Sequence, residues 1–368
     1  MLCRKIPLAA DPAVKLQTPK NKPTNQHPLI QPQSNTVMKT IIHSSILLAL
    51  ASSGIAFGAA TATTIPVGYE TLAVTSGFNY LGARLQTPVL VAGLITAKDA
   101  SSITCGTTDL GALLADTTIY ILEVVNANGI TQEFLGSAAI GSVLTTPAGL
   151  TAKLAVNDPY QIRTAPTLAS TFGPANEAGL DTGFFGPGGD IIYLPNPSAP
   201  GGFDQYYYDS GQSSYADFNG TAVDGATVAY NYSDGLVVFA TGVGTPTLTV
   251  SGEVKKGSTG YTMAADAFNY YSSISPAGAT LASAFDAAIP TLDQGFFGPG
   301  GDIIYVPNKA SAGGFDQYYY DSGQTSWADF NGTPVTATTI SLPSGVVIFN
   351  TGAASDLVNT PPSFYSSF

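Results

Sequence analysis

Two segments of this chain are close copies of each other, and this internal repeat limits the fold more than any other feature. Residues 183–223 and 295–335 are identical at 33 of 41 aligned positions, with a constant offset of 112. Each copy carries the same apolar pattern and the same turn residues, so both should fold alike. We therefore predict two modules of one architecture in tandem.

The match continues on both sides of these segments, with one difference in spacing. The first copy carries about 77 residues that the second lacks, roughly residues 83–160. Insertions are tolerated at exposed loops whose ends lie close together, so this segment is predicted to be a small β-rich subdomain or an extra sheet edge. The predicted organisation is module 1 over residues 63–246, with this insertion, and module 2 over residues 247–368.

Short apolar runs between turn residues predict a mainly β protein. The chain holds 40 Gly and 25 Pro, and these residues separate many short runs rich in Val, Ile, Leu and Tyr. This pattern is typical of sandwiches and barrels. We expect two tandem β-sandwich or barrel-like modules, with a hairpin in the insertion. Short helices are expected near residues 107–115, 167–172 and 280–289.

The first 62 residues are predicted to lie outside the fold. Met38 and Lys39 precede an apolar stretch and then small residues, which is typical of a secretory signal peptide over residues 38–62. Residues 1–37 lack apolar periodicity, and we interpret them as a mis-called start or a leader. The apolar stretch is short and interrupted, so we expect a secreted protein without integral membrane insertion.

From residue 63 onward the chain is strongly acidic and nearly devoid of cysteine. Its seven basic and 24 acidic residues give a net charge of −17, which repels nucleic acid phosphates, so no nucleic-acid partner is expected. Cys105 is its single cysteine, which excludes an intramolecular disulfide. Lys255 and Lys256 stand in a polar stretch that is typical of a solvated turn.

The same segment also lacks histidine, which argues against an enzyme. Serine–histidine, cysteine–histidine and histidine–metal catalysis all need an imidazole that this part of the chain does not supply. A paired-carboxylate hydrolase stays open. Both copies keep the same aspartates, however, so no single acid–base pair stands out.

A tyrosine-rich strand recurs in each module. Residues 203–209 and 315–321 alternate so that both faces of the strand carry aromatic rings. One interpretation is a strand packed on both sides. The other is an exposed platform that stacks on sugar rings or packs against a neighbouring subunit. The residues of this second interpretation are Tyr206, Tyr207, Tyr208, Tyr215, Tyr318, Tyr319, Tyr320 and Trp327.

Repeated aspartates are candidate calcium ligands, and no other cofactor is indicated. Calcium takes about six to eight oxygen ligands, but no segment has the alternating spacing of a dedicated calcium loop. The alternative is that these carboxylates cap turns by accepting hydrogen bonds from nearby N–H groups. The candidates are Asp190, Asp204, Asp209, Asp217, Asp302, Asp316, Asp321 and Asp329.

The order of several pieces of the chain is shared with a family of bacterial proteins. Residues 67–72 and 77–82 come first, then residues 167–170, the Tyr206-Tyr207-Tyr208 strand and residues 276–282. In this order they resemble an uncharacterised family of secreted two-repeat proteins found mainly in Verrucomicrobia. The resemblance covers nearly the whole exported chain. It implies an envelope or extracellular destination and brings no activity or site.

These features favour a non-catalytic surface, extracellular-matrix or fibre subunit that works by self-assembly. Tandem modules suit head-to-tail contacts, because each presents an edge that its twin can recognise. Residues 63–74 are a candidate strand for pairing with a neighbouring subunit. The alternative function is a carbohydrate-binding or adhesion protein that uses the tyrosine-rich strands on surface glycans.

Overall fold

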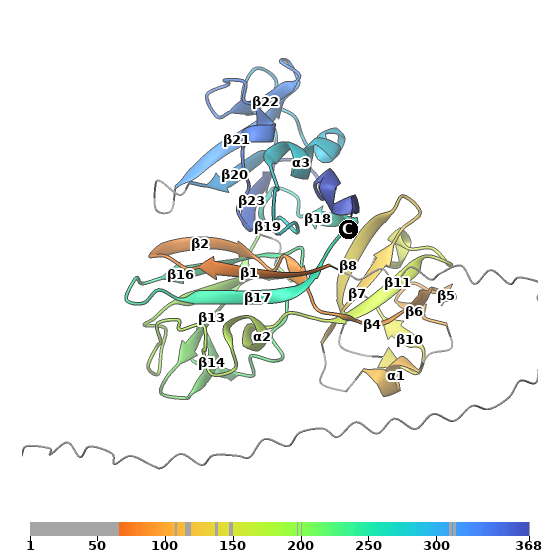
Figure 1. Ribbon diagram of the computed structural model, residues 1–368, viewed down its shortest axis with the longest axis vertical. Coiled ribbons are helices and arrows are strands. Elements are labelled where there is room, and N and C mark those ends of the chain that lie inside the picture. Colours follow the sequence, from red (N-terminus) through yellow and green to blue (C-terminus); the bar gives the residue numbers. More distant parts are fainter. Residues whose placement is uncertain are drawn as a thin grey trace, which may run out of the picture. The chain divides into compact units, whose positions relative to one another are not determined.

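The computed structural model describes residues 66–367, apart from short gaps at 107–108, 115–118, 137–138, 147–149, 197, 200, 309–310 and 312–313. The predicted leader and signal peptide lie outside the described residues. Within them the chain is mainly β, as the sequence predicts, and most strands pair antiparallel in several sheets (Figure 1). No helix in this part of the chain combines the length and apolar character needed to cross a membrane.

Each repeat folds into the same antiparallel sheet. In the first module the order is β15-β14-β13-β12-β16-β2, and in the second it is β19-β23-β20-β21-β22. The first sheet comprises β2 (Gly77–Gly82), β12 (Ile191–Pro195), β13 (Phe203–Asp209), β14 (Ser214–Asp217), β15 (Ala222–Val223) and β16 (Gly235–Ala240). The second comprises β19 (Ala267–Ser272), β20 (Ile303–Pro307), β21 (Phe315–Asp321), β22 (Ser326–Asp329) and β23 (Gly345–Asn350).

A strand pair forms the second layer of each module. In the first, β1 (Val67–Ala73) pairs antiparallel with β17 (Thr247–Val254), which also pairs with β3 (Leu85–Gln86). In the second, β18 (Ser258–Met263) pairs with β24 (Ser355–Asn359). Strand β17 therefore packs with the first module although it follows residue 246. One edge of β1, the strand proposed for pairing with a neighbouring subunit, is used within the chain.

A short helix closes each core at the same place. Helices α2 (Leu168–Phe172) and α3 (Leu281–Phe285) both begin with a capping box, made by Thr167 with Ser170 and by Thr280 with Ser283. Each box satisfies backbone N–H groups that the first turn leaves free. A 3-10 turn, Asp286–Thr291, follows α3. Fully buried equivalents in the two cores are Leu168 and Leu281, Phe172 and Phe285, Ile192 and Ile304, and Val238 and Ile348.

The insertion forms a third body of sheet with its own core. Its hairpin consists of β7 (Tyr120–Val125) and β8 (Ile130–Gly136), with a turn between them as predicted. These strands belong to a sheet of order β24-β18-β8-β7-β11-β4, with β4 (Val89–Leu94) and β11 (Pro159–Thr164). The smaller elements are β5 (Ala97–Lys98), β6 (Ser102–Thr104), α1 (Leu110–Leu113), β9 (Ala139–Ile140), β10 (Val143–Thr145) and a 3-10 turn at Leu150–Lys153.

This insertion joins the two modules, because β8 pairs in parallel with β18 of the second module. Figure 1 shows the inserted strands beside β18, on the opposite side from β13 and β14. Cys105 lies in the core of the insertion and is fully buried. Burial raises the pKa of its thiol to about 11, so the thiol is protonated and inert at neutral pH.

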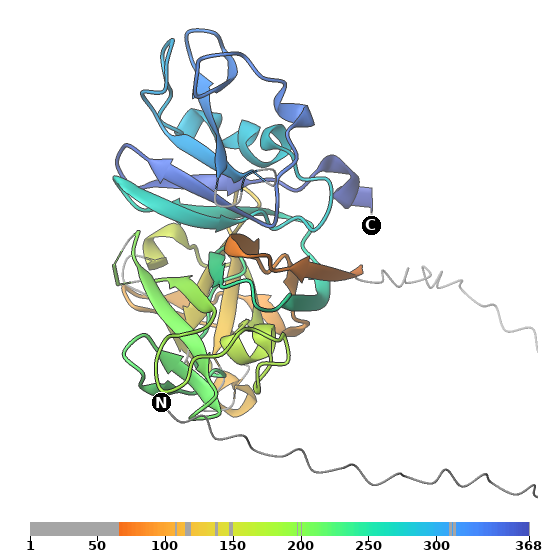
Figure 2. The same cartoon turned by 90° about the vertical axis from the view of Figure 1, so that its left-hand side faces the viewer.

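The two modules also contact each other directly, through equivalent residues on both sides. Tyr80 of β2 packs on Phe315 of β21, and the equivalent pair in the other direction, Tyr270 of β19 and Phe203 of β13, packs likewise. A contact that repeats with its partners exchanged is the mark of a two-fold interface. The second module, in blue and teal, lies against the first along this contact in Figure 2.

Glycine is needed at this interface. A Cβ atom on Gly235 would lie 2.8 Å from the backbone nitrogen of Tyr271, and one on Gly345 would lie 2.6 Å from that of Leu81. Both glycines begin equivalent strands, β16 and β23. Their retention in both copies is explained by the close approach of the two backbones.

Candidate functional site

The tyrosine-rich strands do not form an exposed platform, which corrects that interpretation of the sequence. Tyr207 and Tyr319 are completely buried, and Tyr215 and Trp327 expose only 2% and 4% of their surfaces. Tyr208 is buried as well, whereas Tyr206, Tyr318 and Tyr320 are partly buried. The rings are covered because helix α2 or α3 packs on one side of the sheet and the loop before β12 or β20 covers the other.

The polar tips of Tyr215 and Trp327 have partners in the core. The Tyr215 hydroxyl donates to the carbonyl oxygen of Gly173 at 2.7 Å, just beyond α2. At the equivalent position the Trp327 Nε1–H donates to Asp286 Oδ1 at 2.8 Å, just beyond α3. The exchange of Tyr for Trp between the copies is therefore matched by a different acceptor at the end of the helix.

The repeated aspartates accept hydrogen bonds from the turns around them. Asp209 accepts from the backbone N–H groups of Phe185 and Gly211 at 3.1 and 2.8 Å. Asp190 accepts from Asp181 and Thr241 at 3.0 and 2.8 Å. Asp217 caps its own turn in the same way, and Asp204 accepts from the Asn196 side chain. Asp302, Asp316, Asp321 and Asp329 repeat these bonds in the second module.

These contacts give the carboxylates the turn-capping role that the sequence left open. Oxygens that point at N–H donors are poorly placed to bind a cation as well. Among the described residues there is no group of three or more His, Cys, Asp or Glu side chains placed to hold a metal ion. The hydrogen bonds also hold the pKa values of Asp209 and Asp321 below the ordinary value, despite the opposing effect of burial.

Each module displays exposed phenylalanines at one end, and the sequence analysis did not single them out. We call these the phenylalanine ends. In the first module Phe184, Phe185 and Phe218 expose 73%, 68% and 48% of their surfaces; in the second Phe296, Phe297 and Phe330 expose 72%, 67% and 48%. Gln212 bonds both Asp209 and the carbonyl oxygen of Gly220, which ties the turns that carry these rings together.

The backbone at the phenylalanine ends is strained in both copies. Phe185 and Phe297 have φ angles of 51° and 49°, in the left-handed region that large side chains avoid. Asp209 holds Phe185 in place through its N–H, and the Phe185 ring lies over Gly211, where a Cβ atom would come within 2.7 Å of it. Strain of this kind costs about 1–3 kcal/mol and persists only where surrounding contacts enforce it.

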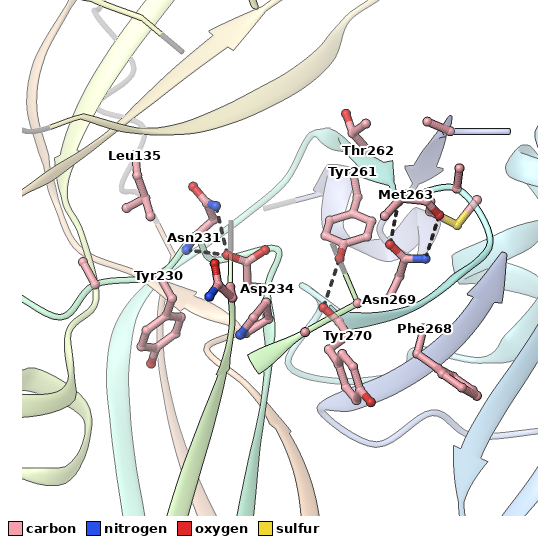
Figure 3. Close-up of a pocket in the computed structure, with 18 residues that line it drawn as sticks. Leu135, Tyr230, Asn231, Asp234, Tyr261, Thr262, Met263, Phe268, Asn269 and Tyr270 are labelled. Carbon is pink, nitrogen blue, oxygen red and sulfur yellow. Dashed lines mark hydrogen bonds between the residues drawn. The ribbon is translucent and has the colours of Figure 1, made fainter. Parts of the chain in front are cut away.

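Two pockets lie at equivalent places along the interface of the modules. The first, of about 550 Å³, we call the Asp234 pocket (Figure 3). The second, of about 670 Å³, we call the Arg84 pocket. Phe268, Asn269 and Tyr270 line the first, and their equivalents line the second. Further equivalent pairs are Pro195 with Pro307, Asn196 with Asn308, and Asp234 with Ser344.

The two pockets differ in charge. Asp234 lines the first, and both hydrogen bonds from Asn231 reach its Oδ2 atom, at 3.0 and 2.9 Å. Burial raises the pKa of Asp234 to about 6. Arg84 lines the second pocket and is already paired with Glu70 through Nε, at 3.0 Å, and through Nη2.

A buried cluster of charges lies where the insertion meets the linker between β17 and β18. Lys255 is 7% exposed and bonds Glu123 and Glu133 at 2.9 and 2.5 Å, so the prediction of a solvated turn is wrong for this residue. Arg163 bonds Glu123 and Glu253 at 2.8 and 2.5 Å. The cations hold the pKa of Glu123 near 2 although burial alone would raise it.

The comparisons with known proteins give no relative: no family model, no curated protein and no solved structure matches this chain.

Proposed function

We propose that this protein is a secreted, non-catalytic surface subunit that assembles with other copies of itself through its phenylalanine ends. One observation carries the proposal. The six phenylalanines of these ends, three on each module, are exposed to solvent and yet identical in the two copies. Exposed aromatic groups of this kind, when gathered together, mark interaction surfaces rather than folding requirements.

Divergence elsewhere in the repeat supports this argument. Some core positions have changed between the copies, as with Val238 and Ile348 or Tyr215 and Trp327, so packing tolerates substitution there. The phenylalanine ends have not changed, and they keep a strained backbone at Phe185 and Phe297 as well. A solvated loop would gain stability by losing that strain. Binding is the natural reason to retain it.

The number of ends determines what the assembly can be. Each chain carries two equivalent ends, so it can contact two neighbours and form an open chain. Burying one phenylalanine contributes about 2 kcal/mol, whereas association costs roughly 4–15 kcal/mol of lost freedom. A single contact is therefore weak, and assembly should depend steeply on protein concentration. A contact between like ends would also explain why both ends stay identical.

Sedimentation velocity of the purified secreted chain tests this function. We expect large species that grow with concentration for the natural protein, dimers at most for Phe184→Ser with Phe185→Ser, and monomers when Phe296→Ser and Phe297→Ser are added. The matched control is Val243→Ser, since Val243 is 81% exposed in a loop outside the phenylalanine ends. Assembly that persists in the variant with all four substitutions would refute the proposal, and so would a natural protein that stays monomeric at millimolar concentration.

The tyrosine-rich strands do not favour the alternative of glycan binding. Five of their eight rings are buried in the cores of the modules, and the rings of Tyr206, Tyr318 and Tyr320 are partly buried against those cores. The proposal therefore rests on the phenylalanine ends alone.

A further inference from the structure

The Asp234 pocket combines a carboxylate with several aromatic rings. Tyr261 and Phe268 line it, and so do Tyr230 and Tyr270 (Figure 3). The Tyr230 hydroxyl is bonded to Thr171 at 2.6 Å, and the Tyr261 hydroxyl donates to the Tyr270 carbonyl oxygen at 3.3 Å. These two hydroxyls are therefore committed to partners within the protein.

One hydrogen-bond acceptor in this pocket has no donor. Oδ1 of Asn231 is buried and has no hydrogen-bond partner in the described part of the chain. Its Nδ2 donates to Asp234, which fixes the orientation of the amide and leaves Oδ1 as the unsatisfied atom. A buried acceptor without a donor is costly, so the site is suited to a ligand that brings one.

The charges around the pocket are negative on balance, because Lys153, which bonds the lining residue Thr262, is paired with Asp356. None of the described residues that line it is Lys or Arg. Glu133 accepts a hydrogen bond from the backbone N–H of Ser233, beside Asp234, and its charge raises the pKa of Asp234 further. Glu133 belongs to the buried cluster, in which three carboxylates face only two cations, Arg163 and Lys255. The cluster thus adds to the negative charge of Asp234 rather than neutralising it.

We propose that the Asp234 pocket binds an organic ammonium ion. The carboxylate of Asp234 supplies the opposite charge, and the aromatic rings supply the electron-rich faces on which ammonium groups bind. The volume of about 550 Å³ is within the range of small-ligand sites. An ammonium group that carries N–H bonds would also give Asn231 Oδ1 the donor it lacks. This inference does not depend on the proposed assembly.

The Arg84 pocket offers a control within the same molecule. It has the equivalent aromatic side chains, Phe78 and Tyr80, but Ser344 stands where the first pocket has Asp234. The carboxylate of Glu70 also lines this pocket, but it is already paired with the guanidinium group of Arg84 and so offers a second cation little attraction. Aromatic rings thus line both pockets, whereas the carboxylate of Asp234, which is not paired with a lysine or arginine that lines its pocket, belongs to the first alone. Ammonium binding is expected in the Asp234 pocket and not in the Arg84 pocket.

Isothermal titration calorimetry at pH 7.5 with four small probes tests the inference. Choline is compared with its uncharged isostere 3,3-dimethylbutan-1-ol, and ethanolamine with 1-propanol. We expect at least one of the cations to bind about tenfold more tightly than its neutral counterpart. Choline has no N–H donor, so a preference for ethanolamine would assign part of the affinity to Asn231.

Two matched variants locate the binding. Asp234→Asn should weaken cation binding about tenfold, with a thermal unfolding curve recorded to show that the variant folds. Phe268→Leu should weaken it several-fold, whereas Phe78→Leu, at the equivalent place in the Arg84 pocket, should leave it unchanged.

Several results would overturn the inference. These are equal affinity for a cation and its neutral isostere, undiminished binding in a folded Asp234→Asn protein, and no heat from either cation at 10 mM. Binding of glucose in preference to the cations would identify a neutral carbohydrate site instead. None of these results bears on the proposed assembly, which involves different residues and is tested separately by sedimentation of the Phe184→Ser, Phe185→Ser variant.

Discussion

The ring of Tyr80 packs edge-on against that of Phe315, with 4.8 Å between their centroids. Tyr270 and Phe203, the equivalent residues with the modules exchanged, lie 4.1 Å apart. The same contact thus occurs twice in one chain, on two sides of a two-fold interface. Head-to-tail packing of tandem modules would not produce it, since a head-to-tail contact joins two different surfaces.

Removing either ring should destabilise the molecule by a similar amount. For Phe203→Ala and for Phe315→Ala we expect a loss of about 2 kcal/mol in the free energy of unfolding, because each ring is partly buried and packs on two tyrosines, one from each module. Chemical denaturation measures both, with Val243→Ala as the exposed control. A loss confined to one of the two variants would contradict a two-fold interface.

Lys255 should be far more important for stability than an exposed lysine. Replacing it with Met leaves Glu123 and Glu133 buried without their shared cation, and such changes cost about 3–5 kcal/mol. Lys153 is the matched control, since its pair with Asp356 is more than one-third exposed and is worth at most about 1 kcal/mol. Urea denaturation of Lys255→Met and Lys153→Met separates the two; equal losses would mean that the buried cluster is unimportant.

Acid should weaken the protein partly through Glu123. Its pKa is about 2 in the folded state, below the ordinary value of 4.5, so its ionised form stabilises the fold above pH 4.5. That contribution falls as the pH drops from about 4.5 towards 2. The unfolding free energy of Glu123→Gln should therefore depend less on pH in this window, which chemical denaturation at several pH values can measure.

Asp234 should act in the opposite direction. Its pKa is raised to about 6, so its contribution is fully present below the ordinary value of 3.8 and is lost as the pH rises through 6. Asp234→Asn should accordingly be more stable than the natural protein at pH 7.5 and lose this advantage near pH 4. Unfolding curves at the two pH values give the comparison. A variant that is less stable at pH 7.5 would contradict the assigned burial.

The strain at Phe185 can be measured by comparing it with its neighbour. Phe185 adopts a left-handed conformation that costs a large residue about 1–2 kcal/mol, and Phe185→Gly removes this cost because glycine adopts the conformation freely. It should therefore leave stability unchanged or raise it, although the ring loses its contact with Gly211. At Phe184, which is not in that region, the change to Gly should cost about 1 kcal/mol through the added freedom of the unfolded chain. Thermal unfolding of the two variants tests this prediction, and a larger loss of stability for Phe185→Gly than for Phe184→Gly would contradict it.

The general architecture was predictable from the sequence because its signals are local. Turn residues between short apolar runs predict strands, and an identity of 33 in 41 positions predicts two like sheets. The capped helices at Thr167 and Thr280 also fall where short helices were expected. The contact of β8 with β18 was not predictable, because no local pattern says which strand will cover an edge.

The sites were less predictable than the fold. The tyrosines were prominent in the sequence because they are aromatic and repeated, but alternation alone cannot say whether the second face of a strand is covered. Phe184 and Phe185 offered a signal that was available, namely two large apolar residues inside a run of glycines. The Asp234 pocket offered none, since Leu135, Asp234 and Phe268 come together only through the tertiary fold.

The parallel pairing of β8 with β18 has a consequence for how the chain reaches its native state. During synthesis, which starts at the N-terminus, the hairpin of the insertion is complete long before residues 258–260 are made and can cover its open edge. During that interval the edge is exposed to other nascent chains. A product that stops before residue 258 should therefore aggregate rather than persist as a soluble half-molecule.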